Sequence, residues 1–554
     1  MIVRGTQTSE FGRVLSTPAL EFAAALHSEF ETELRTVLHG RQVSRSRSDV
    51  GRLPASGQPV SAQSASGESD EDPRTMPGFR VVGAGQDVCS SPDTPAGTAD
   101  ADVPRTAGIS GDTARGTDSR STDASTGFVE VVAPALGQQI SDALRSGAQL
   151  WVADFHTGLS HRWRNVVTAQ QNLRAVVRGE AFAVDPHNGH RVSIRTRQMP
   201  KVSIRPRDLH AREAHLVWES DSGRRVRSVA GLVDFGLFFF HNAAGLYMRG
   251  EHLRVHLPGI ETAAEAALWN SVFAYAEERM GFERGFIRAT VQVDTFGGAS
   301  FLEDILFALR EHCETVTTGV RAYMSSLISA ARDFADISFD DWTTLNYDEP
   351  SVTALLDRAA ALSAAHGALF SAEYDSTRPE MTRIRVGDPA LVEEARELLN
   401  TTRAHVAAGE TQPTTDPGRT ALIVGARTPN ISIDDVHANI RRVLGYTDTY
   451  LSGLGEYRED GRIIGTAAAE LSHSQLWQWL RNSVELTDGR TFDTTVFTRA
   501  VAEELAVVPL HAADYFHEIA DMLRETVDHP DFTESFVRLA YDRFLVERAA
   551  RRAS

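Results

Sequence analysis

The sequence contains very little cysteine. Cys89 and Cys313 are the two thiols in 554 residues, and they lie far apart in the chain. Two such residues can build neither a disulfide framework nor a cysteine-rich metal site. This scarcity is typical of proteins in a reducing compartment, so we predict a cytoplasmic location.

Long apolar runs and an excess of positive charge are also absent. No stretch reaches the length of about 18 apolar residues that a membrane-spanning helix needs. The opening "MIVRGTQTSEFGRVLSTPALEFAAAL" lacks the apolar core and cleavage site of a signal peptide. The formal net charge is −19, which argues against nucleic-acid binding because phosphate neutralisation needs a basic face. A small acidic metabolite could still be bound by a local arginine.

The composition predicts an ordered body interrupted by one long insertion. Hydrophobic residues make up 42% of the chain and charged residues 24%, enough for a large core. Within residues 1–40 a helical pattern starts at Thr17, with Pro18 in its first turn. Residues 41–126 are rich in Ser, Gly, Asp, Arg, Thr and Pro. We predict a disordered insertion there, with "MPGFRVVGAG" as its only plausible ordered island.

The remainder alternates between strand and helix patterns and then becomes helical. Residues 127–405 contain short buried strands separated by helices such as "AAEAALWNSVFAYAEERM", which favours a parallel barrel. We predict a polar linker at residues 406–429. In residues 430–554 apolar side chains recur at helical spacing, which predicts a C-terminal helical domain. The predicted strands or strand ends are residues 148–155, 201–207, 228–242, 253–261 and 285–295.

Several segments, in order along the chain, resemble the A-type malate synthases. They include "RSGAQLWVADF", "IRPRDLH", "LPGIETAAEAALWNSVFAYAEERMGFERGFIRATVQVDT", "LEDILFALREH" and "AAAELSHSQLWQWLRNSVELTDGR". The resemblance implies a TIM (β/α)₈ barrel with an N-terminal helical clasp and a C-terminal helical domain over the barrel mouth. It also implies an acyltransferase that converts the acyl group to an alkyl group, joining acetyl-CoA to glyoxylate. In that chemistry Mg²⁺ polarises the carbonyl, an arginine stabilises the enolate, and a carboxylate removes a proton.

The resemblance places the catalytic arginine at Arg205, in "IRPRDLH". Asp208 stands where the family has glycine, so a carboxylate there could pair with Arg205 or Arg207. An internal salt bridge and a retained anion site are therefore both open. Arg205, Arg207 and His156 are the candidate substrate-binding residues.

The family's metal ligands and base are largely replaced. Asp294 in "VQVDTFGG" matches a metal-binding glutamate, but Ala322 in "REHCETVTTGVRAYMSS" stands where the resemblance expects the second ligand. The family's FEDS segment reads "FHTG", which places His156 and Thr157 at its acids. Since alanine cannot coordinate a cation, we predict that Mg²⁺ binding is weak or absent.

Counting back from "AELSHSQLWQW" puts Gly465 at the position of the catalytic aspartate. Asp460 could replace that base only if the loop were threaded differently. The segments that bind CoA in the family are hard to recognise, and "SAAHGALFSAEYDS" retains little beyond Gly367.

Three functions remain open at this point. The favoured one is a pseudoenzyme, a malate synthase scaffold kept for binding or regulation, with a protein partner. The second is an enzyme with altered chemistry, in which Arg205, Asp294 and His156 act on another small-molecule acid or acyl-CoA. The third is an active malate synthase of the glyoxylate cycle, or a related condensation of an acyl-CoA with a 2-oxo acid. Whether these three side chains converge on a closed, anion-lined pocket at the barrel mouth is the observation that would narrow the alternatives most.

Overall fold

A computed structural model describes residues 1–9, 11–47, 79–82, 127–180, 182–184, 191–193, 199–220, 223–344, 349–374, 376–422, 428–459, 462–507 and 515–547. Eight strands close into a barrel in the order β10-β11-β12-β13-β2-β3-β6-β9, and all neighbouring pairs are parallel. The predicted TIM barrel is confirmed. The barrel strands are β2 (Phe128–Ala133), β3 (Leu150–Asp154), β6 (Lys201–Arg205), β9 (Leu253–Leu257), β10 (Ile287–Val293), β11 (Cys313–Thr318), β12 (Leu369–Glu373) and β13 (Met381–Val386).

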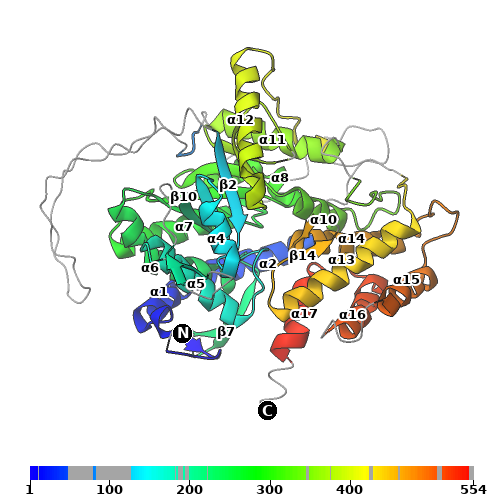
Figure 1. The fold of residues 1–554 in the computed structure, drawn as a ribbon, viewed down its shortest axis with the longest axis horizontal. Helices are drawn as coiled ribbons and strands as arrows, with labels where there is room; N and C mark the ends of the chain where they lie inside the picture. The colour runs from blue at the N-terminus through cyan, green and yellow to red at the C-terminus, as the bar shows by residue number, and fades with distance from the viewer. Residues whose placement is uncertain are drawn as a thin grey trace, which may run out of the picture.

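Helices connect the strands and cover the barrel (Figure 1). Their ends follow local sequence rules: α7 begins with a capping box between Thr262 and Glu265 and ends at Gly281, where φ is +75°. Gly367 ends α11 in the same left-handed conformation. The helices are α4 (Gly137–Arg145), α5 (Trp163–Val177), α6 (Ala230–Met248), α7 (Ala263–Met280), α8 (Phe296–Ser300), α9 (Leu302–Ala308), α10 (Val320–Ala330), α11 (Pro350–His366) and α12 (Val392–Ala407).

One predicted strand region is wrong. Residues 228–242 contain only the end of β8 (Arg225–Val229), and the chain then enters α6 at Ala230. Most of α6 is buried, including Phe235, Phe238 and Phe239. A helix that is apolar on nearly every side lacks the periodic pattern that separates a helix from a buried strand.

The N-terminal segment packs against the outside of the barrel. Helix α1 (Thr17–Glu29) lies on α6, and Phe22 stacks on Phe239 with ring centroids 5.8 Å apart. Helix α2 (Glu31–Arg47) continues beyond residue 40. Strand β1 (Ile2–Val3) pairs with β7 (Arg212–Glu219), which pairs with β8, and β4 (Phe182–Val184) pairs with β5 (Arg191–Ser193).

A short part of the predicted insertion contacts the barrel. Val81 is buried, and its N–H donates to the carbonyl of His366, while Phe79 stacks on the His366 ring. These residues belong to "MPGFRVVGAG". The rest of the stretch from 48 to 126 lies outside the described residues, so its disorder stays a prediction.

The C-terminal helices gather beside α10 at one side of the barrel, drawn from yellow to red in Figure 1. Helix α14 packs on both α10 and α13, which joins this domain to the barrel. No helix in the described part of the chain is both long and apolar enough to cross a membrane. The elements are α13 (Ile433–Ser452), β14 (Tyr457–Glu459), β15 (Arg462–Ile464), α14 (Thr466–Arg481), α15 (Thr494–Val507), α16 (Phe516–Asp528) and α17 (Phe536–Tyr541).

Candidate functional site

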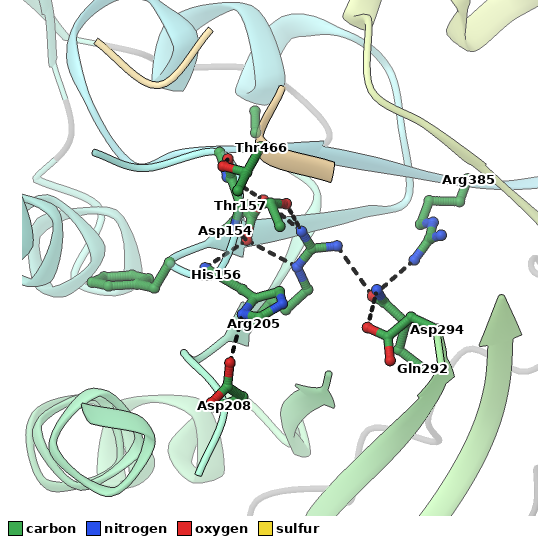
Figure 2. Close-up of polar contacts among 12 residues, drawn as sticks. Asp154, His156, Thr157, Arg205, Asp208, Gln292, Asp294, Arg385 and Thr466 are labelled. Atoms are coloured by element: carbon green, nitrogen blue, oxygen red, sulfur yellow. Dashed lines mark hydrogen bonds and ion pairs between the residues drawn. The ribbon is translucent and has the colours of Figure 1, made fainter. Parts of the chain in front are cut away.

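Polar side chains meet at the ends of three barrel strands, of which β3 and β6 are neighbours and β10 is separated from β6 by β9. Asp154 ends β3, Arg205 ends β6, and Asp294 directly follows β10. Because the carboxyl ends of parallel strands share one rim of the barrel, these residues face one site, as Figure 2 shows. Arg205 and Asp294, predicted from the sequence, are linked there through Gln292.

Arg205 is held by an internal carboxylate. Its Nε and Nη2 donate to the two oxygens of Asp154 at 2.9 and 2.8 Å, and Nη1 donates to Gln292 Oε1 at 3.1 Å. Burial alone would raise the pKa of Asp154, but the Arg205 guanidinium outweighs it and the pKa falls to about 2. The Asp154 carboxylate is therefore ionised at neutral pH.

Asp154 also builds the loop that follows β3. Its carboxylate accepts hydrogen bonds from the backbone N–H groups of His156, Thr157 and Gly158 at 2.8, 3.2 and 2.7 Å. The loop sits tightly on this group, since a Cβ at Gly158 would lie 2.9 Å from Asp154 Oδ2. The sequence analysis missed Asp154, although an acid at the end of the buried strand in "LWVADF" was the available signal.

Arg207 lies in a separate buried ion-pair cluster. It donates to Asp234 at 2.7 and 2.8 Å and to Glu213 at 2.8 Å. Burial alone would lower the pKa of Arg207, but these two carboxylates outweigh it and the pKa rises above its usual value. The sequence left open a pairing of Asp208 with Arg205 or Arg207; the acids that hold these two guanidiniums come from other elements.

Asp208 instead organises a turn and faces His156. Its Oδ1 accepts from the N–H groups of His210 and Ala211 at 2.7 and 2.8 Å. Its Oδ2 lies 3.9 Å from His156 Nδ1, and the two side chains are 21% and 20% exposed. Burial, helped by Arg205 and opposed by Asp208, lowers the pKa of His156, which keeps its imidazole neutral at neutral pH. In Figure 2 this histidine points toward Asp208, away from Asp294.

Asp294 is 3% exposed, and protein groups donate to both of its oxygens. Oδ1 accepts from the N–H of Gly259 at 2.9 Å, and Oδ2 accepts from Gln292 Nε2 at 3.0 Å. Ala322 lies in the first turn of α10, which starts beside Asp294. Within the described parts of the chain, no group of three or more His, Cys, Asp or Glu side chains is arranged to hold a metal ion.

Gly465 lies at the start of α14 with free space around its Cα. Among the residues that the structure describes, a Cβ built at this position would meet no atom within 4 Å. The next residue, Thr466, donates to the carbonyl of Thr157 at 2.9 Å, so the C-terminal domain touches the loop that carries His156. Asp460, the alternative base, lies outside the described residues.

Gln292, Arg385 and His256 were also not predicted from the sequence. Arg385 on β13 donates to Gln292 Oε1 at 3.2 Å and to Glu373 at 2.9 Å. His256 on β9 is fully buried, and neither ring nitrogen has a hydrogen-bond partner among the described residues. Polar residues at every second position of buried strands, as in "TVQVD" and "RIRV", were the available signal.

Two family models match the chain. The malate synthase TIM barrel domain matches residues 201–366, and the malate synthase C-terminal domain matches residues 430–544. A solved structure of Haloferax volcanii malate synthase, a pyruvate/acetyl-CoA ternary complex, aligns with a TM-score of 0.38 and 13% identity over 63% of this chain and 89% of that one.

Full-length relatives cover most of the sequence. Malate synthase of Myxococcus xanthus (strain DK1622) is 30% identical over 462 residues, which are 76% of this chain and 82% of that protein. The glyoxysomal malate synthase of Zea mays is 28% identical, over 91% and 87% of the two chains. Malate synthase A of Escherichia coli (strain K12) is 26% identical, over 69% and 75%. The chain therefore belongs to the malate synthase family.

Proposed function

We propose that this member of the family does not catalyse the Mg²⁺-dependent condensation of acetyl-CoA with glyoxylate. One observation carries the proposal: the base position and one ligand position have no polar side chain, while the arginine and acid that remain are bound to other protein groups. Gly465 and Ala322 are the two empty positions. Arg205 is paired with Asp154, and Asp294 accepts from Gln292 and Gly259.

Each loss affects a different part of the reaction. A missing general base typically costs about 10²- to 10⁴-fold in rate. A missing cation removes the polarisation of the carbonyl that accepts the new bond. Because Asp294 already accepts two hydrogen bonds, it is a poor remaining ligand for a hard cation, and we propose that Mg²⁺ binds weakly or not at all.

A second function is favoured by His156 and Asp208. A neutral imidazole beside a carboxylate is a competent general base, and this pair lies at the barrel mouth next to Arg205. An enzyme of altered chemistry would use it on a small-molecule acid or an acyl-CoA other than acetyl-CoA. His156→Ala would abolish such an activity while leaving the Arg205–Asp154 pair in place.

The cellular location and the binding partner are also part of the proposal. We propose a cytoplasmic protein, because a chain with two cysteines is suited to a reducing compartment. If the barrel has no catalytic role, we propose that the protein acts by binding a protein partner. Import into an organelle, as the name of the Zea mays relative indicates for that protein, would overturn the cytoplasmic location.

Release of free CoA tests the main proposal directly. The purified protein is mixed with acetyl-CoA, glyoxylate and Mg²⁺, and a thiol reagent follows the product, with the Escherichia coli relative as positive control. We expect no glyoxylate-dependent signal from the unaltered chain. CoA release at rates ordinary for an enzyme would overturn the proposal and make Asp460 the first candidate for the base.

Restoring the missing groups provides the matched test. Ala322→Asp alone should stay inactive, because the base is still absent. Ala322→Asp combined with Gly465→Asp, His156→Glu and Thr157→Asp should recover detectable turnover if the scaffold admits CoA. The Cβ introduced by Gly465→Asp would meet no atom of the described residues within 4 Å. Gly158 is kept, because a side chain there would press on Asp154.

A further inference from the structure

Gln292 occupies the centre of the polar network at the barrel mouth. It lies on β10, is 4% exposed, and bonds to groups of opposite charge at its two ends. Its Oε1 accepts from Arg205 Nη1 at 3.1 Å and from Arg385 Nη1 at 3.2 Å. Its Nε2 donates to Asp294 Oδ2 at 3.0 Å, as Figure 2 shows.

The chemistry of the partners fixes the orientation of this amide. A guanidinium can only donate hydrogen bonds, and an ionised carboxylate can only accept them. A flipped amide would turn its NH₂ group toward two cations and its oxygen toward an anion. The side chain therefore presents its partial negative charge to Arg205 and Arg385 and its partial positive charge to Asp294.

From this arrangement we infer that the Gln292 amide takes the place of a divalent cation at this rim of the barrel. The inference extends the proposed function, from which it takes the lack of a Mg²⁺ requirement. A buried carboxylate needs a positive partner, and the amide N–H supplies one without adding a net charge. A cation bound at the same point would add to the charge of two guanidiniums, with Asp294 as the one carboxylate that the Gln292 amide contacts to offset it.

Packing around the amide supports the same conclusion. The backbone of Gly319, which precedes α10, lies directly on the Gln292–Asp294 pair. A Cβ at this glycine would be 3.1 Å from Gln292 Nε2 and 2.9 Å from Asp294 Cβ. Gly319 thus closes off one side of the Gln292–Asp294 pair, whereas Mg²⁺ requires near-octahedral oxygen ligands and usually keeps several waters.

Substituting Gln292 with glutamate should create a need for a divalent cation at this point. Gln292→Glu keeps the shape of the side chain but places a carboxylate oxygen against Asp294. Two carboxylates so close cannot both stay ionised without a positive charge between them. The variant should therefore gain a dependence on divalent cations that the unaltered protein lacks.

The experiment measures cation binding, not turnover. Unaltered protein and Gln292→Glu are titrated with MgCl₂ in a calorimeter and melted in Mg²⁺ or EDTA at matched ionic strength. Gln170→Glu, a buried site on α5, is the control for burying a new carboxylate elsewhere. We expect saturable Mg²⁺ binding and a raised melting temperature only for Gln292→Glu.

Two results would overturn the inference. One is saturable Mg²⁺ binding by the unaltered protein, which needs no variant to be decisive. The other is a folded Gln292→Glu protein that melts identically in Mg²⁺ and EDTA. If Gln292→Glu folds only with Mg²⁺ present, the inference is supported. Turnover by the unaltered protein without Mg²⁺ binding would refute the proposed function and leave this inference intact, so the two failures are distinguishable.

Discussion

Replacing Asp154 with asparagine should destabilise the barrel strongly, even though the residue lies at the candidate site. The lowering of the Asp154 pKa from 3.8 to about 2 corresponds to about 2 kcal/mol in favour of the ionised form in the folded state. Asparagine also leaves the buried Arg205 guanidinium without a counter-charge, and removing one partner of a buried ion pair typically costs about 3–5 kcal/mol. We therefore expect Asp154→Asn to lower the free energy of unfolding by about 3–5 kcal/mol.

Urea unfolding at neutral pH, followed by tryptophan fluorescence, measures this loss. Asp142→Asn, on the exposed face of α4, is the matched control and should change the free energy of unfolding by less than about 0.5 kcal/mol. Asp154→Asn with Arg205→Met should regain part of the loss, because the unpaired charge is removed. The ion-pair contribution should persist above pH 3.8 and disappear as the pH falls toward 2, since the folded-state pKa is the lower one. A single variant as stable as the unaltered protein, or a double variant less stable than the single one, would refute the reasoning.

Two other predictions concern the N-terminal half of the chain. Burial lowers the pKa of His27 from 6.5 to about 4, so the unfolded state binds the extra proton and about 3 kcal/mol of stability is lost as the pH falls from 6.5 to 4. In His27→Gln that loss should be absent from urea unfolding curves recorded across this range, and an unchanged pH dependence would contradict the assignment. Deleting residues 83–126 should leave the thermal midpoint nearly unchanged, because their composition supplies little core. A large fall in the calorimetric midpoint would contradict it.

The fold could be predicted because its signal is local and repeated. Buried strands alternate with helices along residues 127–405, and the resemblance to malate synthases placed them in a barrel. Helix α6 escaped prediction because burial on nearly every side removed its period. The missing groups at Ala322 and Gly465 were also readable from the sequence, since alanine and glycine have no polar side-chain atom in any conformation.

How the polar residues of the site pair with one another could not be read from the sequence. Asp154, Gln292 and Arg385 lie on three different strands, 93 residues separate Gln292 from Arg385, and only barrel closure brings them together. Asp208 looked like the partner of Arg205 because it is three residues away. The bidentate partner is instead Asp154 on the neighbouring strand β3, whose register places it directly opposite Arg205. Sequence proximity thus misled the choice of partner where sheet pairing decided it.

The presence of an arginine at a family's catalytic position is weak evidence for catalysis in this barrel. Arg205 and Asp154 are each buried, so losing either one alone would strand a charge at a cost of about 3–5 kcal/mol. This loss of stability is a reason for the chain to retain both residues whether or not it catalyses a reaction. Gly465 is under no such constraint. In the part of the chain that the structure describes, a Cβ there would meet no atom within 4 Å, so a side chain can be absent without opening a cavity. The positions that best indicate activity are therefore those where a substitution would not destabilise the fold. Gly465 is such a position, and it carries no side chain that could act as a base.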